Sequence, residues 1–126
     1  MQYLLDTNCC IYLLAGSHPA LTARVERCAV GEVAISAIVY AEVALGTAHG
    51  KSPDLAGLAA FVGQVPVLPF DYAAGRAYAG LPFRRGRFDR LLAAHALSLD
   101  ATVITNNEAD FADIPGLKIE NWTLPL

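Results

Sequence analysis

The chain has 126 residues, of which 55% are hydrophobic and 17% charged, so it is long enough to build one domain with a sizeable apolar core. A formal net charge of −3 argues against a protein that coats nucleic acid through bulk positive charge, although it leaves room for a local basic patch. No apolar run reaches the roughly 18 residues that cross a bilayer, and the N-terminus lacks the basic start and cleavage site of a secretory signal. We therefore expect a cytoplasmic protein without a membrane segment, in which residues 1–126 form a single domain.

Short apolar segments rich in β-branched residues alternate with helical segments along the chain. In chain order we expect a strand at Gln2–Leu5, helices at Thr7–Ala15 and Ala20–Cys28, a strand at Val33–Ser36, helices at about Ala37–Ala48 and Leu55–Val62, a strand at Val65–Leu68, helices at Tyr72–Ala79 and Asp89–Leu99, a strand at Thr102–Thr105 and an edge strand at Lys118–Glu120. Apolar strands separated by helices are typical of a parallel sheet covered on both faces. The predicted fold class is therefore α/β, with three layers.

The first carboxylate of the chain follows directly after a predicted core strand. Asp6 lies between the apolar pair Leu4 and Leu5 and a helical segment, so one interpretation is an N-cap of that helix and nothing more. A second interpretation comes from the sheet, because open parallel sheets bind ligands beyond the carboxyl ends of their strands. The residues around Asp6 leave both interpretations open.

Polar side chains from three further segments are expected at the same edge of the sheet. Glu42 lies among apolar residues of a helix, where a carboxylate is costly unless it is paired or binds a metal; the alternative is a solvent-facing glutamate. Asp89 begins the next informative helix, and its alternative role is an N-cap. Asn107 and Asp110 follow the strand Thr102–Thr105, where the alternative is a polar surface loop.

Carboxylates that meet in one crevice repel one another unless a cation compensates their charge. The expected donors are oxygen atoms, with Thr105 nearby and no histidine or cysteine among them. Such a set favours Mg²⁺, with Mn²⁺ as a substitute, over zinc. A divalent cation held in this way activates water and stabilises the leaving oxygen of a phosphodiester. We therefore expect a magnesium site for phosphoryl chemistry, built from Asp6, Glu42, Asp89 and Asp110.

Four segments follow one another between Leu4 and Trp122: LLDTN, SAIVYAEVALG, FDRLLAAHAL and ATVITNNEADFADIPGLKIENW. In this order they resemble the PIN-domain ribonucleases, and most closely the VapC toxins of bacterial toxin–antitoxin pairs. The resemblance implies a PIN-like three-layer α/β/α sandwich with a central, mostly parallel sheet. It also implies a Mg²⁺-dependent endoribonuclease that pairs as a homodimer and forms a hetero-oligomer with a VapB-like antitoxin.

The resemblance also implies roles for individual residues. The carboxylates that match the family's metal ligands by position are Asp6, Glu42 and Asp89. The fourth acidic position of the family varies, and either Asn107 or Asp110 fills it here. Thr7 and Ser36 match polar positions that support the site, through hydrogen bonds to the carboxylates or to metal-bound water.

Arginines cluster in one short stretch of the chain. The basic residues of this stretch are Arg84, Arg85, Arg87 and Arg90, and Phe83 and Phe88 lie beside them. Arginine side chains bind phosphates and aromatic rings stack on bases, so we expect this stretch to contact RNA. The alternative is a solvated loop whose two phenylalanines pack inward.

Three other functions use some of the same residues. A housekeeping RNA-processing nuclease of the same fold would differ from a toxin in having no antitoxin gene beside its own. A phospho-acceptor or phosphatase domain also places an aspartate after a strand with Mg²⁺, but it needs a lysine there, and neither Lys51 nor Lys118 follows a core strand near the acids. A non-catalytic module, whose acids bind a basic peptide, would show no metal-dependent RNA cleavage.

Overall fold

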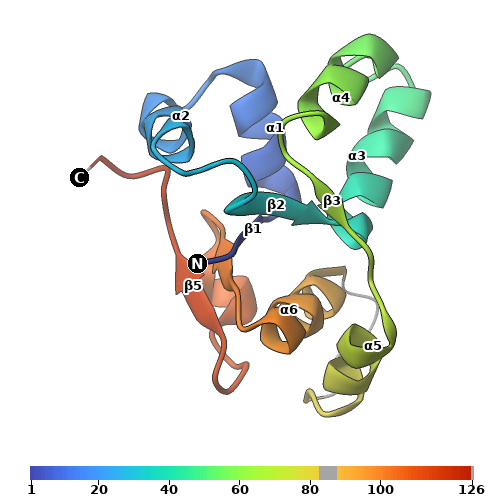
Figure 1. The fold of residues 1–126 in the computed structure, drawn as a ribbon, viewed down its shortest axis with the longest axis vertical. Coiled ribbons are helices and arrows are strands. Elements are labelled where there is room, and N and C mark those ends of the chain that lie inside the picture. Colours follow the sequence, from blue (N-terminus) through green and yellow to red (C-terminus); the bar gives the residue numbers. More distant parts are fainter. Residues whose placement is uncertain (83–87, 126) are drawn as a thin grey trace.

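A parallel sheet of five strands lies at the centre of the computed structural model, which describes residues 1–82 and 88–125 (Figure 1). The strands are β1 (Tyr3–Leu5), β2 (Val33–Ser36), β3 (Val67–Leu68), β4 (Thr102–Ile104) and β5 (Lys118–Glu120). Their order across the sheet is β3-β2-β1-β4-β5, and every pairing is parallel. The carboxyl ends of all these strands therefore lie at one edge, which is where the sequence predicts the site.

Helices cover both faces of the sheet. They are α1 (Thr7–Ala15), α2 (Pro19–Glu26), α3 (Ala37–Ala48), α4 (Leu55–Val62), α5 (Tyr72–Ala79), α6 (Phe88–Leu99) and the short 3-10 helix η1 (Glu108–Phe111). Figure 1 shows α1, α2 and α4 on one side of the sheet and α5 and α6 on the other. Helix α3 begins directly after β2 and contacts α1, α4 and α6. The predicted three-layer α/β class is confirmed, and no described helix is long and apolar enough to cross a membrane.

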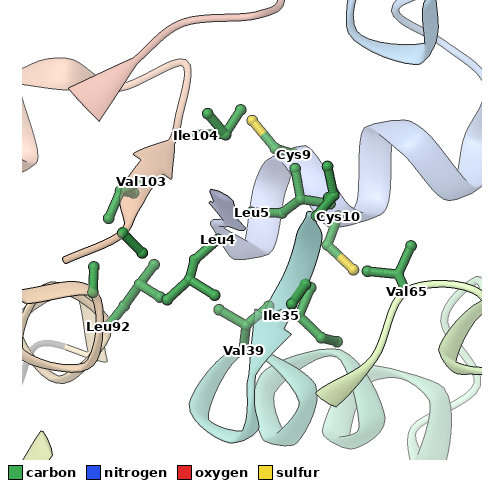
Figure 2. Close-up of a cluster of buried hydrophobic side chains, with 14 of the residues drawn as sticks. Leu4, Leu5, Cys9, Cys10, Ile35, Val39, Val65, Leu92, Val103 and Ile104 are labelled. Atoms are coloured by element: carbon green, nitrogen blue, oxygen red, sulfur yellow. The ribbon is translucent and has the colours of Figure 1, made fainter. Parts of the chain in front are cut away.

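The two leucines of β1 pack on opposite faces of the sheet, as successive residues of a strand must. Neither Leu4 nor Leu5 has exposed surface. In Figure 2, Leu4 points toward Leu92 of α6, whereas Leu5 lies beside Cys9 and Cys10 of α1. The central strand is thus buried from both sides, which fixes the position of the residue that follows it, Asp6.

The predicted elements differ from the observed ones mainly at their ends. Strand β3 begins at Val67 and not at Val65, because Pro66 has no N–H to donate and contributes only its carbonyl, to Ile35 N at 3.0 Å. Helix α2 begins one residue earlier than predicted, at Pro19, whose ring suits the first turn of a helix. The turn η1 was not predicted, and it lies in the segment that carries Asp110.

Candidate active site

Asp6 lies at the carboxyl end of β1 and caps α1. Its backbone N–H donates to Ile104 O at 2.9 Å, which continues the pairing of β1 with β4 by one residue. Its Oδ1 accepts the N–H of Cys9 at 2.8 Å, and only 7% of Asp6 is exposed. The predicted cap is therefore present, and the side chain of Cys9 also interacts with the Asp6 carboxylate.

The charge of Asp6 also acts on the two cysteines of α1. Burial raises the pKa of Cys9 strongly, and it raises the pKa of Cys10 to about 12. The negative charge of Asp6 is the next cause in both cases. Both side chains therefore remain neutral thiols at physiological pH, so they do not act as thiolate ligands beside Asp6.

A hydrogen bond joins the residue after Asp6 to the acid of α3. The hydroxyl of Thr7 donates to Glu42 Oε1 at 2.8 Å, and both side chains are partly buried. The structure thus brings Glu42 to the start of α1, although the two residues are 35 positions apart in the sequence. This contact agrees with the supporting role that the resemblance implies for Thr7.

Ser36 ends β2 at the same edge of the sheet and caps α3. Its Oγ accepts the N–H of Ile38 at 3.1 Å and lies 2.8 Å from Nδ1 of His95. The sequence predicts His95 as a packed or half-exposed residue of α6 and not as a base, and it is buried, with 1% exposed. Burial lowers the pKa of His95, and the charge of Asp71 opposes this effect. The bond between Ser36 and His95 had no signal in the sequence.

The residues after β4 form a connected group. Thr105 is fully buried, and its Oγ1 accepts the N–H of Asn107 at 3.0 Å. The side-chain amide of Asn107 in turn donates to Asp110 Oδ2 at 2.7 Å. Asn107 and Asp110, which the sequence offers as alternatives for the fourth position, are therefore direct partners of each other.

Asp89 lies in the first turn of α6 and is partly buried. The helix begins at Phe88, so Asp89 stands inside the helix and not at its N-cap. A carboxylate in the first turn interacts favourably with the helix dipole. Both Asp89 and Asp110 make further contacts, so neither is a free carboxylate in this structure.

The predicted RNA-binding arginines divide into two groups. Arg84, Arg85 and Arg87 lie outside the described residues. Arg90 is 4% exposed, and its Nη2 contacts both carboxylate oxygens of Asp113, at 2.8 and 2.7 Å. The expectation that Arg90 binds RNA is therefore corrected: its position in α6 directs the side chain into the protein, where it forms an ion pair. Phe88, by contrast, is 54% exposed.

The donor atoms at this edge of the sheet fit a divalent cation by their chemistry. Asp6 and Glu42 both offer carboxylate oxygens, which suit a hard cation. In the part of the chain that the structure describes, no three His, Cys, Asp or Glu side chains lie close enough together to hold a metal ion. Magnesium ions in proteins are usually held by one or two carboxylates together with water and substrate phosphates, so a site at this edge does not need a cluster of three acids.

Comparison with known proteins identifies the family. Residues 3–117 match the sequence profile described as PIN domain. The chain belongs to the PIN domain family. A relative from Shigella flexneri, named tRNA(fMet)-specific endonuclease VapC, is 32% identical over 133 residues, which cover 98% of this chain and 99% of the relative.

Solved structures of PIN-domain proteins agree with this assignment. VapBC2 from Rickettsia felis, crystallised with a DNA fragment from its promoter, matches with a TM-score of 0.84 and 30% identity over 97% of this chain and 99% of that chain. VapBC-1 from nontypeable Haemophilus influenzae matches with a TM-score of 0.80 and 30% identity over 98% and 100% of the two chains.

Membership of the PIN-domain family confirms the resemblance inferred from the four motifs, and it places the chain among ribonucleases. PIN-domain nucleases depend on metal ions in general. A phospho-acceptor domain, a phosphatase and a purely binding module are therefore set aside.

Proposed function

We propose that this chain is the toxin of a toxin–antitoxin pair, a cytoplasmic endoribonuclease that uses Mg²⁺, or Mn²⁺ in its place. The observation that carries the proposal is the link from β1 to α3, in which Asp6 ends the central strand and Thr7 hydrogen-bonds Glu42. This bond links Glu42 to the residue next to Asp6, at the edge where a parallel sheet binds its ligands, which supports a shared site. The relatives that match over the full chain carry VapC names, which supports the same reaction class.

The residues proposed to hold the cation are Asp6, Glu42 and Asp89, with the pair of Asn107 and Asp110 completing the site or orienting water. A bound Mg²⁺ would lower the pKa of a water molecule and stabilise charge on the phosphodiester. The protein's own part is to hold these residues: Asp6 through its cap bond, the Glu42 carboxylate through Thr7, and the Asn107 backbone N–H through Thr105. Because Asp6 is buried and Thr7 and Glu42 are partly buried, their positions are partly preorganised before the cation binds.

RNA binding is proposed for the arginines at positions 84, 85 and 87, without Arg90. Their guanidinium groups suit phosphate oxygens, and an exposed Phe88 beside them suits stacking on an unpaired base. The Shigella relative is named for tRNA(fMet), so this tRNA is the first substrate to test. A VapB-like antitoxin is the proposed protein partner, since the matching structures are VapBC complexes, and the chain itself is proposed to form a homodimer.

The test is RNA cleavage by an Asp6→Asn variant. Asparagine keeps an oxygen that can cap α1 but loses the charge, so the variant should fold and yet cleave no RNA. Asp54→Asn is the matched control, because Asp54 caps α4 in the same way, with Oδ1 accepting Gly57 N at 2.8 Å, away from the sheet edge. Wild-type cleavage rates in Asp6→Asn would overturn the proposed function.

A further inference from the structure

A buried hydrogen bond joins the start of α3 to the middle of α6. The two atoms, Ser36 Oγ and His95 Nδ1, lie 2.8 Å apart and belong to residues separated by 59 positions. Ser36 has no exposed surface, and His95 is 1% exposed. The bond therefore fixes one helix against the other inside the protein.

The surroundings of Ser36 determine which group is the donor. Ser36 Oγ already accepts the N–H of Ile38, as the cap of α3. Its hydroxyl proton then needs an acceptor, and among the described residues His95 Nδ1 is the one to which it is hydrogen-bonded. A buried donor left without an acceptor costs free energy. With Ser36 as the donor, Nδ1 of His95 accepts, which corresponds to a neutral imidazole that carries its proton on Nε2.

The packing around His95 suits this neutral form. The rings of His95 and Phe70 pack edge to face, with their centroids 5.6 Å apart. Burial also lowers the pKa of His95. Asp71, the N-cap of α5, is the charged group that acts on His95 in the opposite direction among the described residues. A proton added to Nδ1 would remove the acceptor and leave the Ser36 hydroxyl unpaired.

We propose that His95 is a positioning residue of the nuclease: by accepting the Ser36 hydroxyl bond it sets the spacing between the helices that carry Glu42 and Asp89. The inference rests on the proposed function, in which these two acids share one cation. Helix α3 begins at Ala37, next to Ser36, and carries Glu42, whereas α6 carries both Asp89 and His95. Loss of the bond allows the two helices to shift, and small shifts of ligands or reacting groups reduce rates strongly.

The first test is the ¹⁵N NMR spectrum of the His95 ring in the wild-type protein at neutral pH. We expect shifts typical of a neutral ring protonated on Nε2. A proton on Nδ1, or on both nitrogens, would overturn the proposal. This measurement does not depend on RNA cleavage, so it distinguishes a failure of this inference from a failure of the proposed function.

The second test compares two variants with the wild type. His95→Phe keeps a ring without the acceptor and should cleave RNA about 10- to 100-fold more slowly, with unchanged affinity for RNA. His95→Asn keeps an acceptor near the position of Nδ1 and should stay close to the wild-type rate. A folded His95→Phe variant that cleaves at the wild-type rate would contradict the positioning role.

The pH profile provides a readout that remains decisive if His95→Phe does not fold. Wild-type activity should fall on acidification as His95 is protonated, and His95→Asn should not show that fall. His49→Asn, the same substitution at an exposed histidine, should keep the wild-type profile. An identical acid loss in the wild type and in His95→Asn would overturn the proposal.

Discussion

Thr7 donates its hydroxyl proton to Glu42 across the gap between α1 and α3, at a distance of 2.8 Å. Thr7 is the immediate neighbour of Asp6, so this bond helps to set the position of Glu42 relative to Asp6, which follows the central strand β1. It holds a proposed metal ligand at one of its two oxygens while the other stays available.

Replacing Thr7 with valine should therefore reduce RNA cleavage while leaving the fold intact. Valine has nearly the shape of threonine but cannot donate, and a misplaced Glu42 should slow cleavage by about tenfold or more. Thr47→Val is the matched control. Thr47 lies in the last turn of α3, and its Oγ1 donates to the carbonyl of Pro53, in the loop that follows, at 2.7 Å. Equal cleavage rates for Thr7→Val and Thr47→Val would show that the Glu42 contact has no role in activity.

Arg90 should contribute to stability and not to RNA affinity. Arg90→Met removes the buried guanidinium that contacts both oxygens of Asp113, and removing one member of such a pair costs about 3–5 kcal/mol of unfolding free energy when both groups are buried. We expect a value at or below the lower end, because 36% of the Asp113 side chain is exposed. Urea unfolding measures the loss, and RNA affinity measured below the unfolding transition should be unchanged.

A surface ion pair provides the control for this comparison. Lys118 Nζ lies 3.1 Å from Asp100 Oδ1, with both side chains well exposed. Lys118→Met should cost less than about 1 kcal/mol, as exposed pairs generally do. An Arg90→Met variant that unfolds at the wild-type urea concentration but binds RNA weakly would restore the original interpretation of Arg90.

Protonation of His95 should couple folding to pH. Its pKa is lowered in the folded state by burial, so the unfolded chain takes up the proton first as the pH falls. The stabilisation is fully present above the unfolded value of about 6.5 and is lost as the pH falls through the lower pKa of the folded state. The unfolding free energy of His95→Asn should lack this part of the pH dependence, whereas that of His49→Asn should retain it.

Much of the architecture follows from local patterns in the sequence. Apolar strands interrupted by helices identify the α/β class because a buried parallel strand needs both faces apolar, as Leu4 and Leu5 show. Helix α1 could be bounded at both ends, since Asp6 caps its start and Gly16 ends it in the left-handed conformation that glycine tolerates. The pairing of β1 with both β2 and β4 required the structure, because strand order depends on contacts between distant segments.

The site was harder to predict where a residue's role depends on whether its side chain points into the protein or toward the surface. Arg90 was assigned to a basic surface because it neighbours three other arginines in the sequence. Its helical spacing to Ala93 and Ala94, both fully buried, is the signal that places it on the inner face of α6. The bond between Ser36 and His95 and the pairing of Asn107 with Asp110 depend on tertiary contacts and local turns that sequence periodicity does not encode.

The central claim is that Asp6, Glu42 and Asp89 gather around one divalent cation. The most direct measurement is a crystal structure of the protein grown with Mn²⁺ and recorded at a wavelength that reveals manganese by anomalous scattering. We predict one anomalous peak at the carboxyl edge of the sheet, with oxygens of all three carboxylates at bonding distance. A peak elsewhere, or a bound ion that leaves Glu42 or Asp89 out of reach, would contradict the account.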